Sequence, residues 1–290
     1  MTEILRRKRH RPFTPTSRDD RLCQDGYCMR LFSTEQIAER FCEETESVYF
    51  PAIDPAAADP LKRGGKRPIL RMVPSRKAAN ERLKILRTNG LFVSREHRKP
   101  DGSKTNVWML SKSEFRAQAE YRGVDPEERY PGWPRGRVQH LLDTNDLYVK
   151  IAGDLDATLG PNHGRDPGWE WLDERRAHDR YAVSWDPRPR YHQPDAEVLF
   201  CGCTFVVERQ SGRAKETEGA IRQKVLRHKE RVAYLLLAER SELSVVFACD
   251  QERDARYARE AAQEAGLALF AGTLEGAADH LIDAAMRLSP

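Results

Sequence analysis

Long apolar segments are missing from this sequence of 290 residues. No stretch approaches the roughly 18 consecutive apolar residues that a membrane-spanning helix requires. The first residues, MTEILRRKRHRPF, carry positive charge with no apolar run behind them, which is unlike a secretory signal. Hydrophobic residues make up 39% of the chain and charged residues 32%, as in a polar globular protein. We therefore expect a cytoplasmic protein with no membrane partner.

Paired cysteines are missing as well. The chain has six cysteines, but none forms a CxxC pair and no histidine lies at zinc-finger spacing from them. Cys201 and Cys203 are expected to alternate on a strand and to share one of its faces. We expect reduced, mostly buried thiols rather than a structural zinc site.

A strong excess of one charge is also lacking, since 49 basic residues face 45 acidic ones and the net charge is +4. The basic residues are nevertheless clustered, from Arg6 to Arg11, from Lys62 to Arg71 and from Arg76 to Arg98. Clustered cations are typical of phosphate binding. For the first cluster, a solvated tail is an equally good interpretation, and we expect residues 1–16 to be a disordered basic tail.

Several sequence patterns predict helices in the N-terminal half. Residues 17–31 are expected to be helical, and Ser33 with Gln36 three positions later indicates the start of a second helix. Residues 45–74 are rich in Pro, Ala and Gly, which predicts a loop or an insertion. A third helix is expected from Ser75 to the pair Asn89-Gly90, with apolar residues at helical spacing.

Two strand-like runs then flank Pro100-Asp101-Gly102, which predicts a β-hairpin. The order helix, short helix, basic helix and hairpin is that of a winged helix-turn-helix. In such a domain the third helix enters the major groove of DNA, and the hairpin tip reaches flanking phosphates or the minor groove. A winged-helix fold used for protein contact is the alternative interpretation.

The candidate DNA-binding residues follow from this arrangement. Arg76 and Asn80 are the residue types that read guanine and adenine. The expected recognition helix presents Arg76, Lys77, Asn80 and Lys84, and the wing presents Arg95, Arg98, Lys99 and Lys104.

A Pro-, Gly- and Arg-rich linker, PEERYPGWPRGR, places an expected domain boundary near Pro131. We thus expect a DNA-binding domain over residues 17–130 and a second domain over residues 131–290. The second domain begins with an amphipathic helix over residues 138–158, and strand-like runs then alternate with helical ones. This alternation predicts an α/β sheet that is partly parallel, so the fold class is α/β, or α+β for the whole chain.

Two acidic residues in the second domain have the spacing of a metal site. Asp195 precedes one expected strand, and Glu208 and Gln210 end the next one on a shared face. Carboxylates at one strand end suit Mg²⁺ or Mn²⁺, and a bound metal would activate water for phosphodiester hydrolysis. We expect Asp195 and Glu208 to be the metal ligands. The alternative is that Asp195 is a turn residue and that Glu208 and Gln210 end a strand in solvent.

The pattern Pro194-Asp195, a short hairpin, and then Glu208-Arg209-Gln210 resembles the PD-(D/E)xK nuclease fold. This resemblance implies catalytic roles for residues in and around the motif. The implied catalytic set is Glu174, Asp195, Glu208, Gln210 and Lys224, supported by His140 and His228.

The whole order of motifs resembles one family in particular, the replication-relaxation proteins of plasmids, phages and other mobile elements. Its features here are RDDRL, LFSTEQIAERFC, RLKILRTNGLFVSR, the H-x-x-x-x-N-D-L-Y element at His140, Asn145 and Asp146, and the Trp171-x-x-Glu174 motif. The resemblance covers roughly residues 17–237. Gln210 and His228 stand where the family often has an acidic residue and a tyrosine.

This resemblance implies a DNA-binding protein of a mobile element that acts in replication, transfer or transposition. Its nuclease-like domain would be a magnesium-dependent DNA endonuclease or nickase. Two alternatives stay open: a non-catalytic regulator or accessory factor with a degenerate nuclease fold, and a nuclease of the defence or toxin type. Double-stranded DNA is the expected partner, and a homodimer and contacts with replication or transfer proteins are further expectations.

Overall fold

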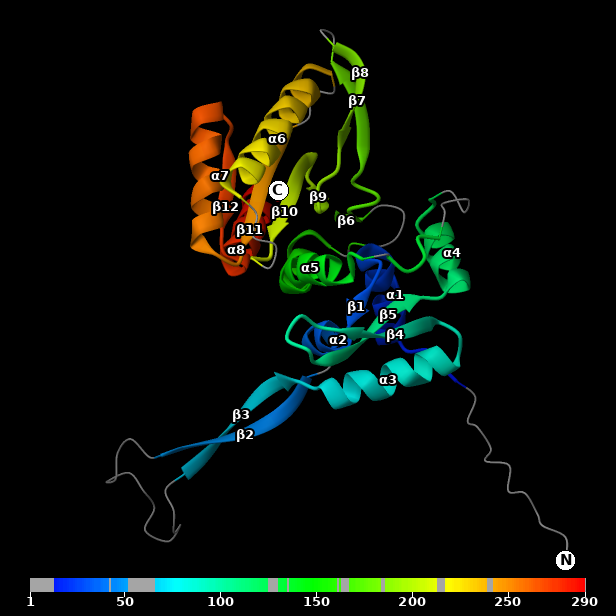
Figure 1. Ribbon diagram of the computed structural model, residues 1–290. Coiled ribbons are helices and arrows are strands. Elements are labelled where there is room, and N and C mark those ends of the chain that lie inside the picture. Colours follow the sequence, from blue (N-terminus) through cyan, green and yellow to red (C-terminus); the bar gives the residue numbers. More distant parts are fainter. Residues whose placement is uncertain are drawn as a thin grey trace, which may run out of the picture.

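The structure is a computed structural model, and it describes residues 13–41, 43–51, 66–124, 130–134, 136–160, 162, 167–183, 186–212, 217–238 and 242–289. Most of the expected basic tail, residues 1–12, lies outside this range, whereas Thr16 caps the first helix with its side chain. The fold mixes helices and sheets (Figure 1). No helix among the residues described is long and apolar enough to cross a membrane.

The described residues of the N-terminal half form four helices and a three-stranded antiparallel sheet of order β1-β5-β4. Its elements are α1 (Ser17–Met29), β1 (Phe32–Ser33), α2 (Thr34–Phe41), β2 (Glu43–Pro51), β3 (Lys66–Pro74), α3 (Arg76–Thr88), β4 (Phe92–Arg98), β5 (Lys104–Leu110) and α4 (Lys112–Tyr121).

Local signals in the sequence explain where these helices begin and end. Gln36 and Ser33 form a reciprocal cap, since each side chain accepts from the backbone N–H of the other, at 2.9 and 3.2 Å. The Ser75 side chain accepts from the N–H of Ala78 at the start of α3. Gly90 follows the end of α3 with a φ of 79°, a conformation that favours glycine. The expected caps and the β4–β5 hairpin are confirmed.

The segment between α2 and α3 differs from expectation. Most of residues 43–74 were expected to be loop, but β2 and β3 pair antiparallel from Glu43 opposite Pro74 to Pro51 opposite Lys66. This ribbon projects from the body beside the N-terminus of α3 (Figure 1). The proline, alanine and glycine content obscured two flanking runs, each of which supplies backbone hydrogen-bond partners for the other.

The C-terminal half is built on a five-stranded sheet of order β12-β11-β10-β9-β6. Strands β6, β9 and β10 are antiparallel, and β10, β11 and β12 are parallel, which confirms a partly parallel sheet. Its elements are α5 (Val138–Leu159), β6 (Trp169–Asp173), β7 (Asp179–Val183), β8 (Asp186–His192), β9 (Ala196–Phe200), β10 (Cys203–Gln210), α6 (Glu218–Ala238), β11 (Glu242–Cys249), α7 (Glu252–Ala265), β12 (Leu269–Gly272) and α8 (Leu274–Leu288).

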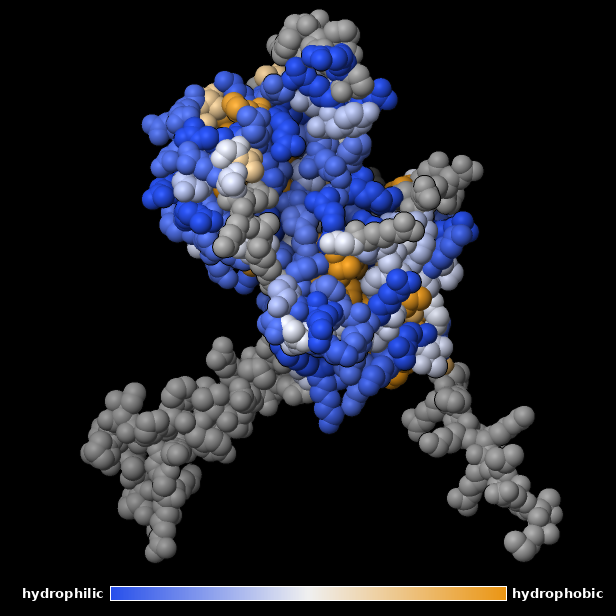
Figure 2. All heavy atoms as spheres, viewed as in Figure 1, coloured by the Kyte–Doolittle hydropathy of each residue, from blue (hydrophilic) through white to orange (hydrophobic). Residues whose placement is uncertain are grey.

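Helices cover both faces of this sheet. On β11, Val246 and Ala248 pack in one core cluster with α5 and α8, whereas Val245 and Phe247 pack in another with α6 and α7. Because successive side chains of a strand point to opposite faces, the two helix pairs lie on opposite sides of the sheet. Figure 2 shows that the visible described surface is predominantly hydrophilic, as expected for helices with one buried face.

Two details of this half were predicted wrongly or missed. Cys201 and Gly202 form the two-residue turn between β9 and β10, with φ values of 50° and 75°, so Cys201 and Cys203 do not share a strand face. Cys201 is exposed, while Cys23, Cys28 and Cys249 are buried as expected. The β7–β8 hairpin was not expected at all, because the prolines on β8 are unusual in a strand.

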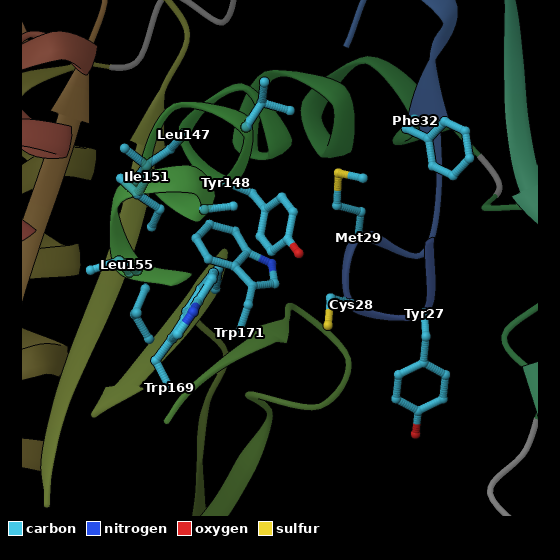
Figure 3. Close-up of a cluster of buried hydrophobic side chains, with 14 of the residues drawn as sticks. Tyr27, Cys28, Met29, Phe32, Leu147, Tyr148, Ile151, Leu155, Trp169 and Trp171 are labelled. Atoms are coloured by element: carbon cyan, nitrogen blue, oxygen red, sulfur yellow. The ribbon is translucent and has the colours of Figure 1, made fainter. Parts of the chain in front are cut away.

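The two halves share buried contacts around α5. Figure 3 shows Tyr148 of α5 beside Trp169 and Trp171 of β6, on the side that faces Cys28 and Met29 of α1. One core cluster contains side chains from both sides of the expected boundary near Pro131. This packing fixes α5 between the small N-terminal sheet and the five-stranded sheet (Figure 1).

Candidate functional site

The outward face of α3 carries most of the predicted DNA-binding side chains of that helix. Arg76, Lys77 and Lys84 are exposed, while Asn80 is half-buried. The Asn80 side-chain oxygen is enclosed and has no hydrogen-bond partner among the described residues. Arg76 is the least free of the three cations, because its guanidinium lies 3.7 Å from the carboxylate of Glu35 on α2.

The β4–β5 hairpin carries the other four predicted cations in different settings. Arg98 is exposed, and Lys104 pairs with Glu96 at 2.7 Å across the hairpin. Lys99 lies 3.5 Å from the same Glu35 carboxylate that Arg76 approaches. The Arg95 guanidinium stacks over the Trp133 ring, 4.9 Å from its centre. Three of the four cations therefore already have a neighbour, and Arg98 is the most open one.

Asp195, immediately before β9, is held by two donors. His140 Nε2 donates to Oδ1 at 2.6 Å, and the backbone N–H of Arg209 donates to Oδ2 at 2.7 Å. The hydrogen bond to Asp195 raises the pKa of His140, against the opposing effect of burial. A cationic histidine beside a buried carboxylate forms a charge-assisted pair, which is stronger than a neutral hydrogen bond.

Glu174 belongs to the same group of side chains. Its Oε1 accepts from Arg137 Nη1 at 2.5 Å and from Gln193 Nε2 at 3.0 Å, so it tethers the start of α5 to the segment that leads into β9. We call Arg137, His140, Glu174, Gln193 and Asp195 the Asp195 cluster. Sequence reasoning missed Arg137 and Gln193, which carry no motif of their own.

Glu208 lies in a second group of buried polar side chains. His228 Nε2 donates to Oε1 at 2.9 Å, and Lys224 Nζ lies 3.3 Å from Oε2. Burial alone would raise the pKa of Glu208, but these two partners outweigh it and lower the pKa to about 2. Lys224 and His228, which the resemblance groups with Glu208, thus both contact its carboxylate.

His192, which sequence reasoning missed, extends this group. Its Nε2 lies 3.0 Å from His228 Nδ1, and burial, followed by the neighbouring His228, lowers its pKa to about 3. The ionised Glu208 accepts only, so His228 must donate to it from Nε2, which leaves Nδ1 for the contact with His192. We call Lys224, His228, His192 and Glu208 the Glu208 cluster.

Arg209, between Glu208 and Gln210, organises the end of β10. Its buried guanidinium donates to the carbonyl oxygens of Asp143, Gln210 and Ala248, and to the Asp250 carboxylate. An arginine at a strand end usually lies in solvent, so no sequence signal could have revealed this role. Gln210 shares the face of Glu208 by alternation, and its own carbonyl also accepts from the Asp250 N–H at 2.9 Å.

The carboxylates of Asp195 and Glu208 are held by different protein groups. Asp195 bonds to His140 of α5, whereas Glu208 bonds to His228 and pairs with Lys224, both on α6. All four carboxylate oxygens already accept from a protein group or pair with one. No group of three or more His, Cys, Asp and Glu side chains that could hold a metal ion occurs in the part of the chain that the structure describes. A Mg²⁺ or Mn²⁺ ion at either carboxylate would therefore compete with these protein partners, and the metal site stays a prediction.

Comparison with known proteins adds little to this geometry. No protein-family model matches the chain, and no curated protein matches it. A solved structure, protein VC1899 from Vibrio cholerae, aligns with 72% of this chain and 43% of its own, at 12% identity and a TM-score of 0.31. A similarity at this level defines neither a fold family nor a function, and this chain spans less than half of that protein.

Proposed function

We propose that this protein binds double-stranded DNA through a winged helix-turn-helix formed by residues 17–130. The proposal is supported by the order α1, β1, α2, α3, β4, β5 and by the sheet order β1-β5-β4. The observation that carries it is the outward face of α3, where Arg76, Lys77 and Lys84 are exposed together. A helix of this kind fits the major groove, and its cations would contact phosphates or base edges.

Binding to any duplex tests this proposal, because phosphate contacts need no particular sequence. Fluorescence anisotropy with a labelled duplex would compare the wild type with a Lys77→Ala/Lys84→Ala variant over a range of salt concentrations. We expect weaker binding and a salt slope about 0.9 smaller for each phosphate that the variant no longer neutralises. Lys112→Ala, an exposed lysine on α4, is the matched control. Equal affinity and equal slope for all three proteins would contradict the proposal.

The C-terminal half supports a second candidate function, a nuclease of the PD-(D/E)xK kind. The specific observation is the order β6-β9-β10-β11, with Asp195 entering β9, Glu208 near the end of β10, and α6 leading to the parallel strand β11. A hydrolytic role would require Asp195 and Glu208 to exchange their present partners for a metal ion. A non-catalytic DNA-binding role requires no such change, so the geometry favours the non-catalytic interpretation.

Incubation of supercoiled and linear DNA with the protein and Mg²⁺ or Mn²⁺ separates the two roles. Metal-dependent cutting that disappears in Asp195→Asn and Glu208→Gln, and persists in the surface control Glu252→Gln, would establish the nuclease. Intact DNA under all conditions, together with duplex binding that EDTA does not affect, would establish the non-catalytic role. The resemblance to replication-relaxation proteins supports cytoplasmic action on the DNA of a mobile element, with a homodimer or replication and transfer proteins as partners.

A further inference from the structure

The β7–β8 hairpin presents an exposed group of flat side chains next to both clusters. Arg180 and Tyr191 are directly opposite each other on the two strands, and His178 lies two residues before Arg180. The rings of His178 and Tyr191 stack with centres 5.7 Å apart and planes at 24°, and the Arg180 guanidinium is 5.9 Å from the Tyr191 ring. We call these three residues the Tyr191 platform.

The Tyr191 platform faces away from the protein. Side chains on the other face of the hairpin pack on α6: Tyr181 contacts Tyr234 with ring centres 5.1 Å apart, and His192 meets His228. Because strand side chains alternate, the platform points in the opposite direction. Tyr191 is 58% exposed, and His178 and Arg180 are also exposed. The hairpin rises beside α6, past the end of the five-stranded sheet (Figure 1).

A second arginine–tyrosine pair, on α7, shows that the exposure of Tyr191 is unusual. The Arg256 guanidinium lies 5.6 Å from the Tyr257 ring on α7, but Tyr257 is half-buried and packs against the core between α6 and α7. That tyrosine has a structural reason for its position. Tyr191 leaves most of its surface in solvent, and its ring neighbours are a histidine and an arginine, the side chains on which unpaired bases stack.

We propose that the Tyr191 platform binds an unpaired nucleobase of a DNA partner by stacking. This inference rests on the proposed DNA binding and specifies its substrate as a duplex with a single-stranded segment. Aromatic rings stack on any base, and the Arg180 charge complements the phosphate backbone. Tyr191 stands four positions before Asp195, so their Cα atoms lie within about 14 Å. A strand held on the platform therefore passes close to the Asp195 cluster.

Equilibrium binding to two labelled DNAs tests the inference. One is a blunt duplex, and the other is the same duplex with a single-stranded tail of a few nucleotides that contains 2-aminopurine. We expect the wild type to prefer the tailed DNA, and Tyr191→Ala to weaken tailed binding about 10-fold without changing blunt binding. Stacking should quench the 2-aminopurine fluorescence in the wild type and in Tyr191→Phe, which keeps the ring, but not in Tyr191→Ala.

Tyr121→Ala is the matched control, since Tyr121 on α4 is 54% exposed and has no ring contact among the described residues. Equal binding of the tailed DNA by Tyr191→Ala, Tyr121→Ala and the wild type would overturn the inference while leaving duplex binding intact. If the wild type bound the tailed DNA but not the blunt duplex, and Tyr191→Ala lost this binding, the result would support the platform and contradict the proposed role of α3. No binding of either DNA by the wild type would overturn both.

Discussion

Asn145 offers the sharpest test of how the two halves are joined. This α5 residue is 2% exposed, and its Nδ2 donates to the carbonyl oxygens of Met29 and Leu31, at 3.0 and 2.6 Å. Both carbonyls flank Arg30, which ends α1 with a φ of 62°. Asn145 therefore supplies from the second half the hydrogen bonds that this helix end lacks.

Replacing Asn145 with alanine should lower the free energy of unfolding by about 3–5 kcal/mol. Each buried hydrogen bond contributes about 1 kcal/mol, and a buried carbonyl left without a donor costs about 1–3 kcal/mol more. The Leu31 carbonyl would lose its donor, while the Met29 carbonyl would keep the N–H of Leu31 at 2.6 Å. Asn145→Asp should be at least as harmful, because a carboxylate would face two carbonyl oxygens and offer no donor.

Urea unfolding followed by circular dichroism and tryptophan fluorescence would measure this effect. Asn89→Ala is the matched control, since Asn89 Nδ2 donates to the Ile85 carbonyl at 2.8 Å in an exposed position. We expect that variant to lose less than about 1 kcal/mol. Both probes should show one transition, because the halves share a core. The reasoning is refuted if Asn145→Ala is no more destabilised than Asn89→Ala, or if the halves unfold separately.

Three further predictions concern pH, each read from unfolding experiments at several pH values. The pKa of His140 is raised above 6.5 by Asp195, so the stability that His140→Gln removes should be greatest below pH 6.5 and should fade as the pH rises through the folded-state pKa. The pKa of Glu208 is lowered from 4.5 to about 2, so the stability that Glu208→Gln removes should be present above pH 4.5 and vanish toward pH 2. A loss that does not change with pH would contradict either assignment. The pKa of His192 is lowered from 6.5 to about 3 by burial, so protonation of the unfolded chain should destabilise the wild type as the pH falls through this window. His192→Phe should flatten that dependence, and an unchanged acid response in this variant would count against a buried neutral histidine.

Elements with strong local signals could be predicted from the sequence. The caps at Ser33 and Ser75, the glycine after α3 and the Pro-Asp-Gly turn each act through neighbouring atoms, so their effect does not depend on the rest of the fold. The amphipathic pattern of α5 was clear for the same reason. The alternation of strands and helices likewise indicated a partly parallel sheet.

Two-stranded elements, in which each strand is stabilised mainly by the other, could not be recognised from local sequence signals. The β2–β3 ribbon and the β7–β8 hairpin contain prolines that argue against strands, yet pairing between their two arms satisfies the backbone. Each arm alone has a weak signal. The backbone hydrogen bonds between the arms form only when both arms are in place. They therefore depend on the tertiary structure and not on either arm alone.

The candidate site shows the same division between sequence and structure. The resemblance grouped Glu208 with Lys224 and His228, and one strand with its following helix brings the three together. The direction of the Asp195 carboxylate was not predictable, since it depends on His140 from a helix 55 residues earlier in the chain and on the Arg209 backbone. The sequence by itself thus placed Asp195 before β9 and Glu208 near the end of β10. Only the packing of α5 and α6 on opposite faces of the sheet decided which groups hold these two carboxylates.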